Sequence, residues 1–322
     1  MKKIIAIIVV LAAAGIVAFI LYLPKSRDRN EIFYRSLVTY ENVVYKTVNS
    51  ENLTLDILMP TVDVYDSVPV VIYIHGGSFT SGDKLDLAKD TREDTVPKIL
   101  AAGFAIISVN YRLLNDENNF PSCVIDVKDS IRYIDSVVST YNFDPENIGI
   151  MGSGSGAYLA LTAAYSPSGL YLGEYDLRSF SADVNYVIDL FGPTKLSETK
   201  ATESMSSTEL VEAQNQLDVL YGDGVFDIYN LTATDYEAMS TYDPMSYVSH
   251  DTVPTLIIHG TADTTVNLSQ SILLETKLLE YSISYEFYQI LGGEQGLANI
   301  SESQITQVSS YILDYLLNHY AT

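Results

Sequence analysis

This sequence contains two glycine- and serine-containing stretches, four histidines and one cysteine that could take part in catalysis or metal binding. The two stretches are His75-Gly76-Gly77-Ser78-Phe79 and Gly152-Ser153-Gly154-Ser155-Gly156. A serine on a tight, glycine-flanked turn can act as a nucleophile when a histidine takes its proton. The histidines form neither HExxH nor HxH, and they form no cluster with the cysteine at metal-ligand spacing, so we expect no metal and no cofactor. A single cysteine, Cys123, excludes an intrachain disulfide.

Further short blocks occur in a fixed order along the chain, and together they resemble the α/β-hydrolase esterases and lipases of the carboxylesterase type with an HGG oxyanion motif. The resemblance covers roughly residues 40–320 and implies a mostly parallel sheet flanked by helices, with a Ser-His-acid site. The blocks that carry it, besides the two stretches above, are Val109–Leu113, Phe120–Asp126, Asp144–Gly152, Phe191–Thr194 and Pro254–Asp263. Because a fold alone does not give a function, each position of the site needs its own argument.

The nucleophile position is substituted in this chain. The family pattern Gly-x-Ser-x-Gly maps its two glycines onto Gly152 and Gly156, which places Gly154 in the serine slot. Neither neighbouring serine has glycines at both required positions. We expect Ser153 to point back toward the strand and Ser155 to lie at the start of a helix, where serine is a common capping residue.

The acid position is kept and the histidine position is not. By resemblance, Asp263 occupies the acid slot, and Gln295 stands where the family has histidine. A glutamine amide cannot accept a proton near neutral pH. None of the four histidines is expected to replace it: His75 belongs to the HGG motif, His259 ends a buried strand, His250 precedes that strand, and His319 lies on the last helix.

The groups that would hold an oxyanion are retained. By resemblance, Gly76, Gly77, Ser78 and Ser155 form the oxyanion or ligand-binding set, with the backbone N–H groups of the last three pointing into the pocket. A helix that starts near Ser155 adds a partial positive charge. The sequence thus predicts a cluster of donors with no nucleophile beside it.

Alternating strands and helices are expected to position these residues. A continuous apolar run at residues 68–74 is typical of a buried parallel strand, and strands are also predicted at 42–48, 52–59, 104–109, 147–151, 184–190, 255–259 and 283–290. Helices are predicted at 94–102, 121–140, 155–165, 268–281 and 300–320. This alternation indicates a parallel sheet covered on both faces.

One polar, acidic segment interrupts the rhythm at residues 195–243. It contains a helical stretch near residues 208–221 and lies between two strands. It is either a lid over the carboxyl ends of the sheet or a surface excursion without that role, and the sequence does not choose between them.

The N-terminus predicts a membrane anchor. Residues 4–23 carry no charge, and 20 residues of helix span about 30 Å, the thickness of a bilayer core. The run is longer than the apolar part of a signal peptide, which favours an uncleaved single-pass helix. The expected order is a short segment at 1–3, the anchor at 4–23, a linker at 24–39 and the hydrolase domain at 40–322. We expect the domain outside the cytoplasm, on a bacterial cell surface.

Charge narrows the classes of partner. The chain has 18 Lys and Arg against 41 Asp and Glu, a net charge of −23. Such a field repels nucleic acid, so we expect none as a partner. The membrane and a small carboxylate or ester ligand remain as expected partners, and no protein partner is indicated.

Three functional hypotheses follow. The first is a membrane-anchored carboxylesterase homologue that is catalytically inactive and keeps ligand or partner binding. The second is an active esterase or lipase that uses Ser153 or Ser155 as a displaced nucleophile. The third is a purely structural surface protein.

Overall fold

The computed structural model describes residues 26–91, 94–115, 117–198, 207–222 and 224–320. It divides into two compact units, residues 1–37 and 38–322. The described part of the first unit is the helix α2 (Ser26–Leu37), which Glu31 and Arg35 brace through a 3.0 Å ion pair. This helix falls in the expected linker and was not predicted. The predicted anchor at 4–23 lies outside the described residues, and none of the helices within them is long and apolar enough to cross a membrane.

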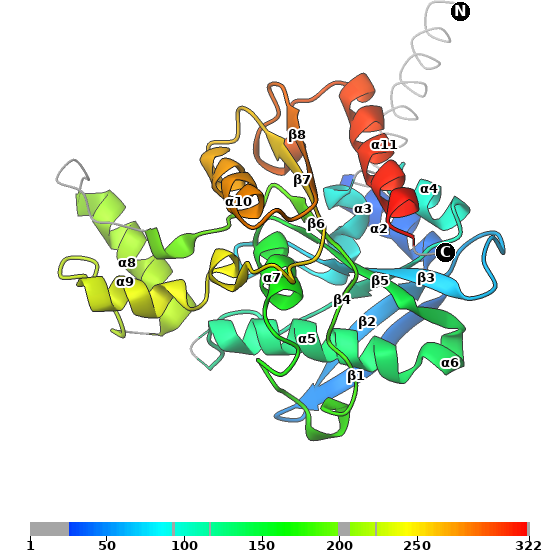
Figure 1. Ribbon diagram of the computed structural model, residues 1–322, viewed down its shortest axis with the longest axis horizontal. Helices are drawn as coiled ribbons and strands as arrows, with labels where there is room; N and C mark the ends of the chain where they lie inside the picture. The colour runs from blue at the N-terminus through cyan, green and yellow to red at the C-terminus, as the bar shows by residue number, and fades with distance from the viewer. Residues whose placement is uncertain (1–25, 92–93, 116, 199–206, 223, 321–322) are drawn as a thin grey trace, which may run out of the picture. The chain divides into compact units, whose positions relative to one another are not determined.

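The second unit is built on one eight-stranded sheet with the order β1-β2-β4-β3-β5-β6-β7-β8 (Figure 1). The pairs β1·β2 and β2·β4 are antiparallel, and every other pair is parallel. The sheet is therefore mostly parallel, as predicted, and its antiparallel pairs lie at one edge. The strands are β1 (Tyr40–Val48), β2 (Glu51–Leu58), β3 (Val68–Ile74), β4 (Ala105–Val109), β5 (Phe143–Ser153), β6 (Val187–Leu190), β7 (Thr255–Gly260) and β8 (Tyr285–Ile290).

Helices cover both faces of this sheet. On one face α5 packs against α7, and α7 packs on β5 and β6; on the other, α4 and α11 pack together, against β4 and β7 respectively. The helices of this unit are α3 (Leu87–Asp90), α4 (Thr95–Ala101), α5 (Phe120–Ser136), α6 (Val138–Tyr141), α7 (Ser155–Tyr165), α8 (Ser207–Tyr221), α9 (Ala233–Ser240), α10 (Ser269–Glu280) and α11 (Glu302–Asn318).

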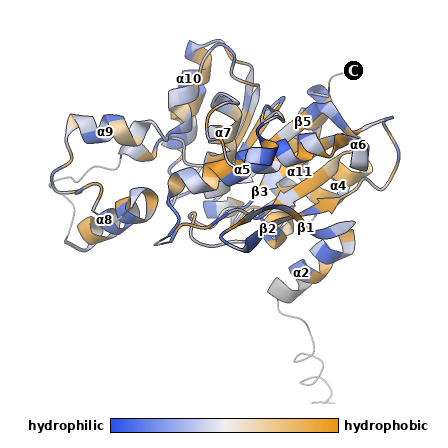
Figure 2. Cartoon of the chain, turned by 90° about the horizontal axis from the view of Figure 1, so that it is seen from below, coloured by the Kyte–Doolittle hydropathy of each residue, from blue (hydrophilic) through white to orange (hydrophobic). Residues whose placement is uncertain are grey.

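The core lies between the sheet and these helices. Strand β3 is buried at six of its seven positions, because its neighbours β4 and β5 flank it and helices cover both its faces. Side chains alternate along a strand, so Val70, Ile72 and Ile74 face the layer of α5 and α7. Figure 2 shows apolar residues concentrated in the central strands, with blue and orange turns alternating along the amphipathic α5.

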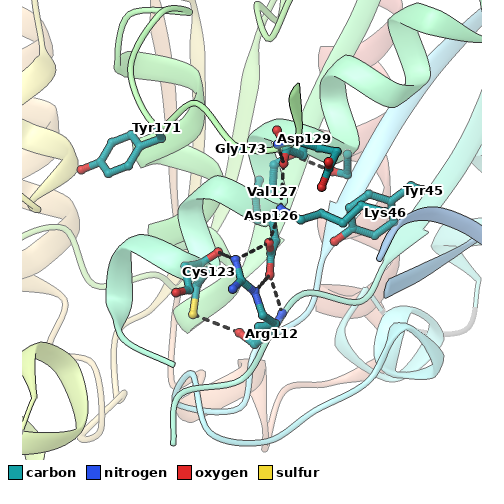
Figure 3. A network of polar contacts seen from close by, with 12 residues as sticks. Tyr45, Lys46, Arg112, Cys123, Asp126, Val127, Asp129, Tyr171 and Gly173 are labelled. Atoms are coloured by element: carbon teal, nitrogen blue, oxygen red, sulfur yellow. Dashed lines mark hydrogen bonds and ion pairs between the residues drawn. The ribbon is translucent and has the colours of Figure 1, made fainter. Parts of the chain in front are cut away.

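A buried ionic network fixes the antiparallel edge to α5 (Figure 3). Lys46 on β1 lies 2.7 Å from both Asp126 and Asp129 on α5. Arg112 donates to Asp126 at 2.8 Å, and Arg132 donates to Asp129 at 2.9 Å. Apart from the partly exposed Arg112, these side chains are almost completely buried, so each charge depends on its partners for solvation.

The segment at 195–243 folds as a small layer of its own beside the sheet, on the left of Figure 1. Its described residues include α8 and α9, and α9 was not predicted. Leu217, Ile228 and Met239 form a separate small core there. Thr232 caps α9 by a reciprocal pair of hydrogen bonds with Asp235.

Candidate active site of the esterase type

Strand β5 ends at Ser153 and helix α7 begins at Ser155, which leaves Gly154 alone at the turn between them. Gly154 has φ +51° and ψ −119°, a conformation that glycine reaches more readily than other residues. Its N–H donates to Leu190 O at 2.9 Å, and its carbonyl receives the first bonds of α7 from Ala157 and Tyr158. The turn is therefore held firmly from both sides.

The three glycines of this turn are glycine for different reasons. A Cβ atom on Gly152 would lie 2.3 Å from Gly156 O, and one on Gly156 would lie 2.2 Å from Ile74 O, so close backbone approach forbids a side chain at both. A Cβ on Gly154 would meet a single atom within 4 Å, Nε2 of Gln295 at 3.8 Å. Space for a side chain thus exists at Gly154 and opens toward Gln295. That these two positions are the nucleophile and histidine slots stays a prediction.

Ser153 points away from that space. Its hydroxyl donates to Asp90 Oδ2 at 2.6 Å and lies 3.0 Å from the hydroxyl of Tyr73, which also donates to Asp90 at 2.7 Å. Ser153 is only 1% exposed. These contacts agree with the expected direction, back toward the strand, and add a carboxylate partner that the sequence did not indicate.

Ser155 begins α7, as predicted, and its hydroxyl is engaged by the loop opposite. Its Oγ accepts a hydrogen bond from the N–H of Phe79 at 3.1 Å. This bond joins the HGG loop to the helix start, so the Ser155 side chain has a structural task.

The HGG loop runs through an unusual series of left-handed conformations. Gly77, Ser78 and Phe79 have φ of +113°, +54° and +65°. Left-handed geometry costs about 1–3 kcal/mol at each non-glycine residue, and such strain often marks functional sites. No residue in the described ranges accepts a hydrogen bond from the N–H of Gly77, Ser78 or Ser155. All three residues line the cavity discussed below.

The loop's histidine is a structural residue. His75 is buried, stacks on Tyr111 with ring centroids 4.4 Å apart, and places Nδ1 2.7 Å from Gly76 O. Burial lowers the pKa of His75, which keeps the ring neutral. A Cβ on Gly82 would lie 2.4 Å from both His75 Nδ1 and Gly76 O, so glycine is required where the loop turns back.

Asp263 and His259 lie close together at the carboxyl end of β7, with His259 Nε2 3.6 Å from Asp263 Oδ2. The role of Asp263 as the acid of the site stays a prediction. Asp263 is buried, and its Oδ1 accepts the N–H groups of Thr265 and Val266, both at 2.9 Å. His259 is the penultimate residue of β7, with Nδ1 2.7 Å from Ser271 Oγ and Nε2 2.8 Å from Val266 O. Burial lowers the pKa of His259. Both ring nitrogens are used inside the fold, which confirms a structural role for this histidine.

Neither remaining histidine lines the cavity. His250 is exposed beside Tyr281, and His319 bonds Tyr315 O at the end of α11. Within the part of the chain that the structure describes, no three His, Cys, Asp or Glu side chains come together as a metal site.

A cavity of about 1200 Å³ joins these parts. Its wall contains the HGG loop, the turn at Gly154, the loop of Gln295 and, from the segment at 195–243, Lys195, Leu196, Asn215 and Leu220. The segment therefore contributes to the wall of the site. Whether it opens and closes as a lid stays a prediction.

The chain matches a known protein family over most of its length. The BD-FAE family model matches residues 55–278, which make up most of the second unit, residues 38–322, called the hydrolase unit below. The chain belongs to the BD-FAE family. This is an α/β-hydrolase family of the esterase type, as the sequence blocks predicted.

One curated relative of this BD-FAE family member is LipM of Mycobacterium tuberculosis, named "Probable carboxylic ester hydrolase". It is 22% identical over 66% of the chain and 45% of LipM. The match spans less than half the length of this and the next most similar curated relatives.

Solved structures repeat the fold over nearly the whole chain. A truncated carbohydrate esterase from gut microbiota has a TM-score of 0.69 at 26% identity, covering 88% of this chain and 97% of that one. Propionate-bound esterase 2 of Thermogutta terrifontis has a TM-score of 0.67 at 20% identity, covering 87% of this chain and 94% of that one. The second likeness concerns the fold alone.

Two carboxylates near the turn at Gly154, those of Asp90 and Asp189, were not predicted from the sequence. Asp90 gave no signal, because its partners Tyr73 and Ser153 come from distant strands. Asp189 on β6 accepts the Gly192 N–H at 2.8 Å, while its Oδ2 is buried without a partner among the described residues. Burial raises the pKa of Asp189 to about 7. Its only sequence signal was an acid inside an apolar strand.

Proposed function

We propose that this chain is a catalytically silent BD-FAE homologue that binds a small ligand carrying a carboxylate or ester group and does not hydrolyse it. One observation carries the proposal. The turn at Gly154 has the space and the neighbour that a nucleophile would need, and the side chain there is absent. The opposite group, Gln295, cannot act as a base.

Loss of two members of a catalytic set leaves little activity. In a well-studied serine protease, removing the serine or the histidine costs about 10⁶ in kcat and leaves about 10³–10⁴ over water. We expect no more than that residual rate here. Binding does not need those two groups, since the cavity and the backbone donors of Gly77, Ser78 and Ser155 are intact.

A turnover assay tests the proposal. The full chain in a mild maltoside detergent is compared with the Gly154→Ser/Gln295→His double variant on p-nitrophenyl acetate, with each single variant as a control. We expect a rate at buffer level for the parent and both single variants, and a rate at least tenfold higher for the double variant. A parent rate well above buffer that Ser153→Ala abolishes would defeat the proposal.

The second candidate function is an esterase with Ser153 as a displaced nucleophile. The contact that favours it is the 2.6 Å hydrogen bond from Ser153 to Asp90, because a carboxylate can receive the serine proton. Its near-complete burial argues against attack on a substrate. Ser155 is a weaker alternative, since its hydroxyl serves the N–H of Phe79.

We further propose that residues 4–23 anchor the chain in a membrane and that the hydrolase unit lies outside the cytoplasm, on a bacterial cell surface. The support is the uncharged run of 20 residues and its flanking lysines and arginines. The anchored ligand-binding unit would then face the medium from which it takes its ligand.

A further inference from the structure

We propose that the site selects carboxylates over esters and amides, and that Gln295 is the residue that determines this choice. The inference rests on the proposed function and narrows its ligand class. In this arrangement the site binds both oxygens of the ligand's carboxylate. Backbone N–H groups bind the first oxygen, and the positions of Gly154 and Gln295 accommodate the second.

The first oxygen lies at the backbone donors. The N–H groups of Gly77, Ser78 and Ser155 lack acceptors in the described ranges, and all three residues line the cavity. Ser155 also begins α7, an 11-residue helix whose first turn carries a partial positive charge. Hydrogen bonds to an ionised acceptor are roughly twice as strong as neutral ones. These donors therefore favour an anion over a neutral carbonyl.

The second oxygen lies in the space at Gly154. The position of a Cβ there is 3.8 Å from Nε2 of Gln295 and has no other neighbour within 4 Å. A ligand oxygen in van der Waals contact with the Gly154 Cα, on the side that faces Gln295, comes within hydrogen-bonding range of Nε2. The amide carries two N–H donors, so it can serve the ligand while it keeps another contact. A serine at 154 would fill this space.

Charges around the cavity are compatible with an anion. Two lysines, Lys89 and Lys195, and two acids, Asp86 and Asp90, line it. The nearby acids have their own donors: Asp90 accepts from Tyr73 and Ser153, and the Lys89 ammonium lies 3.7 Å from both Asp86 and Asp90. These contacts reduce the repulsion that an entering carboxylate meets.

An ester or amide lacks part of this fit. The second oxygen of an ester carries an alkyl group, which occupies the space at Gly154 and blocks the bond to Gln295. A primary amide directs its own N–H groups at the N–H donor of Gln295. Both the ester and the amide are also neutral. We expect the carboxylate to bind at least tenfold more tightly than its methyl ester or primary amide.

Calorimetry on the full chain in maltoside detergent tests this order with acetate, butyrate and octanoate, each beside its methyl ester and primary amide. Gln295→Glu keeps the size of the side chain and replaces the donor with an acceptor. It should weaken carboxylate binding at least tenfold and strengthen amide binding, which reverses the preference. Gln307→Glu, at an exposed position on α11, adds the same charge away from the cavity and should change neither affinity.

Gly154→Ser is the second variant. It should weaken carboxylate binding at least tenfold, with a circular dichroism spectrum like the parent's, because the added atoms meet no crowding. Carboxylate, ester and amide binding equally, with no effect of Gln295→Glu, would overturn the inference and leave the proposed function standing. So would binding of esters alone. If no acid binds at any chain length, the inference is also wrong, whereas ester turnover by the parent would refute the proposed function itself.

Discussion

Gly154 differs from its two glycine neighbours in what a side chain would cost. At Gly152 and Gly156 a side chain would collide with backbone atoms, whereas at Gly154 only the left-handed backbone opposes it. If packing required glycine at all three positions, a Cβ atom at Gly154 would also collide with backbone atoms, and it does not. The proposed substitution at the middle position therefore fits a turn in which glycine relieves backbone strain and a side chain would have room.

This difference can be measured by alanine substitution. Gly154→Ala should lower the free energy of unfolding by about 1–2 kcal/mol, the usual cost of a left-handed non-glycine residue. Gly156→Ala should cost several times more or prevent folding, because its Cβ would lie 2.2 Å from Ile74 O. Urea unfolding of both variants gives the comparison. Equal costs would contradict the assignment of an open space at Gly154.

Asp189 gives the stability of the protein a distinct pH dependence. Its folded pKa of about 7 exceeds its ordinary value of 3.8, so between these values the folded state holds a proton that the unfolded chain has lost. The contribution of Asp189 is fully present below pH 4 and is lost as the pH rises through 7, by up to about 4 kcal/mol.

Asp189→Asn should remove this loss. Relative to the parent, the variant should gain stability steadily from pH 4 to pH 7.5, as followed by urea unfolding at several pH values. A stability difference that stays constant across this range would show that Asp189 is ionised in the folded protein throughout.

At the scale of elements, the attachment of β1 to α5 depends on charges rather than on apolar contact alone. Lys46 is buried between Asp126 and Asp129, and removing one partner of a buried ion pair leaves uncompensated charge. Lys98 offers a matched comparison on α4, because its 2.7 Å pair with Asp94 is largely exposed.

Lys46→Met should therefore lower the free energy of unfolding by about 3–5 kcal/mol, and Lys98→Met by less than about 1 kcal/mol. Lys46 lies 2.7 Å from two buried carboxylates and Lys98 lies 2.7 Å from one partly exposed carboxylate, so the two exchanges differ in burial and in the number of carboxylates that lose a partner. Chemical denaturation of the two variants decides the point. Similar losses would mean that the buried network contributes little.

The order of strands and helices could be predicted because periodicity reports burial directly. The buried run of β3 and the apolar face of α5 gave such signals, and short motifs fixed the register of the turn at Gly154. The helices α2 and α9 gave none: α2 has a mostly polar sequence, and α9 is too short and weakly amphipathic.

Of the residues that line the cavity, Gln295 and the HGG loop could be singled out from the sequence because each belongs to a local motif. The sequence could not reveal the bond from Ser153 to Asp90, since 63 residues separate the two and nothing near Asp90 marks it. Which side chains face one another across the cavity depends on the order of the strands in the sheet. Local sequence patterns do not specify that order.

At the scale of the whole molecule, the acidic composition and the N-terminal run carry the proposals about partners and location. We expect the chain's net charge of −23 to disfavour contact with nucleic acid and with anionic head groups. The predicted anchor at 4–23 would hold it at a membrane all the same, because burial of an apolar helix outweighs surface repulsion.

Membrane attachment through this run has a direct test. The full chain should stay in the membrane fraction after alkaline carbonate extraction, whereas a chain lacking residues 1–25 should be released. Protease added to intact bacterial cells should cut the full chain if the hydrolase unit is outside. Extraction of the full chain by carbonate would contradict the anchor.

We propose that no serine of this site acts as a nucleophile. Incubation of the full chain with a fluorophosphonate, followed by intact-mass measurement and peptide mapping, tests it most directly, with the Gly154→Ser/Gln295→His variant as the positive control. We expect an unchanged mass for the parent and, for the variant, a single adduct on the serine introduced at position 154. A stoichiometric adduct on Ser153 or Ser155 of the parent would contradict it and identify a working esterase.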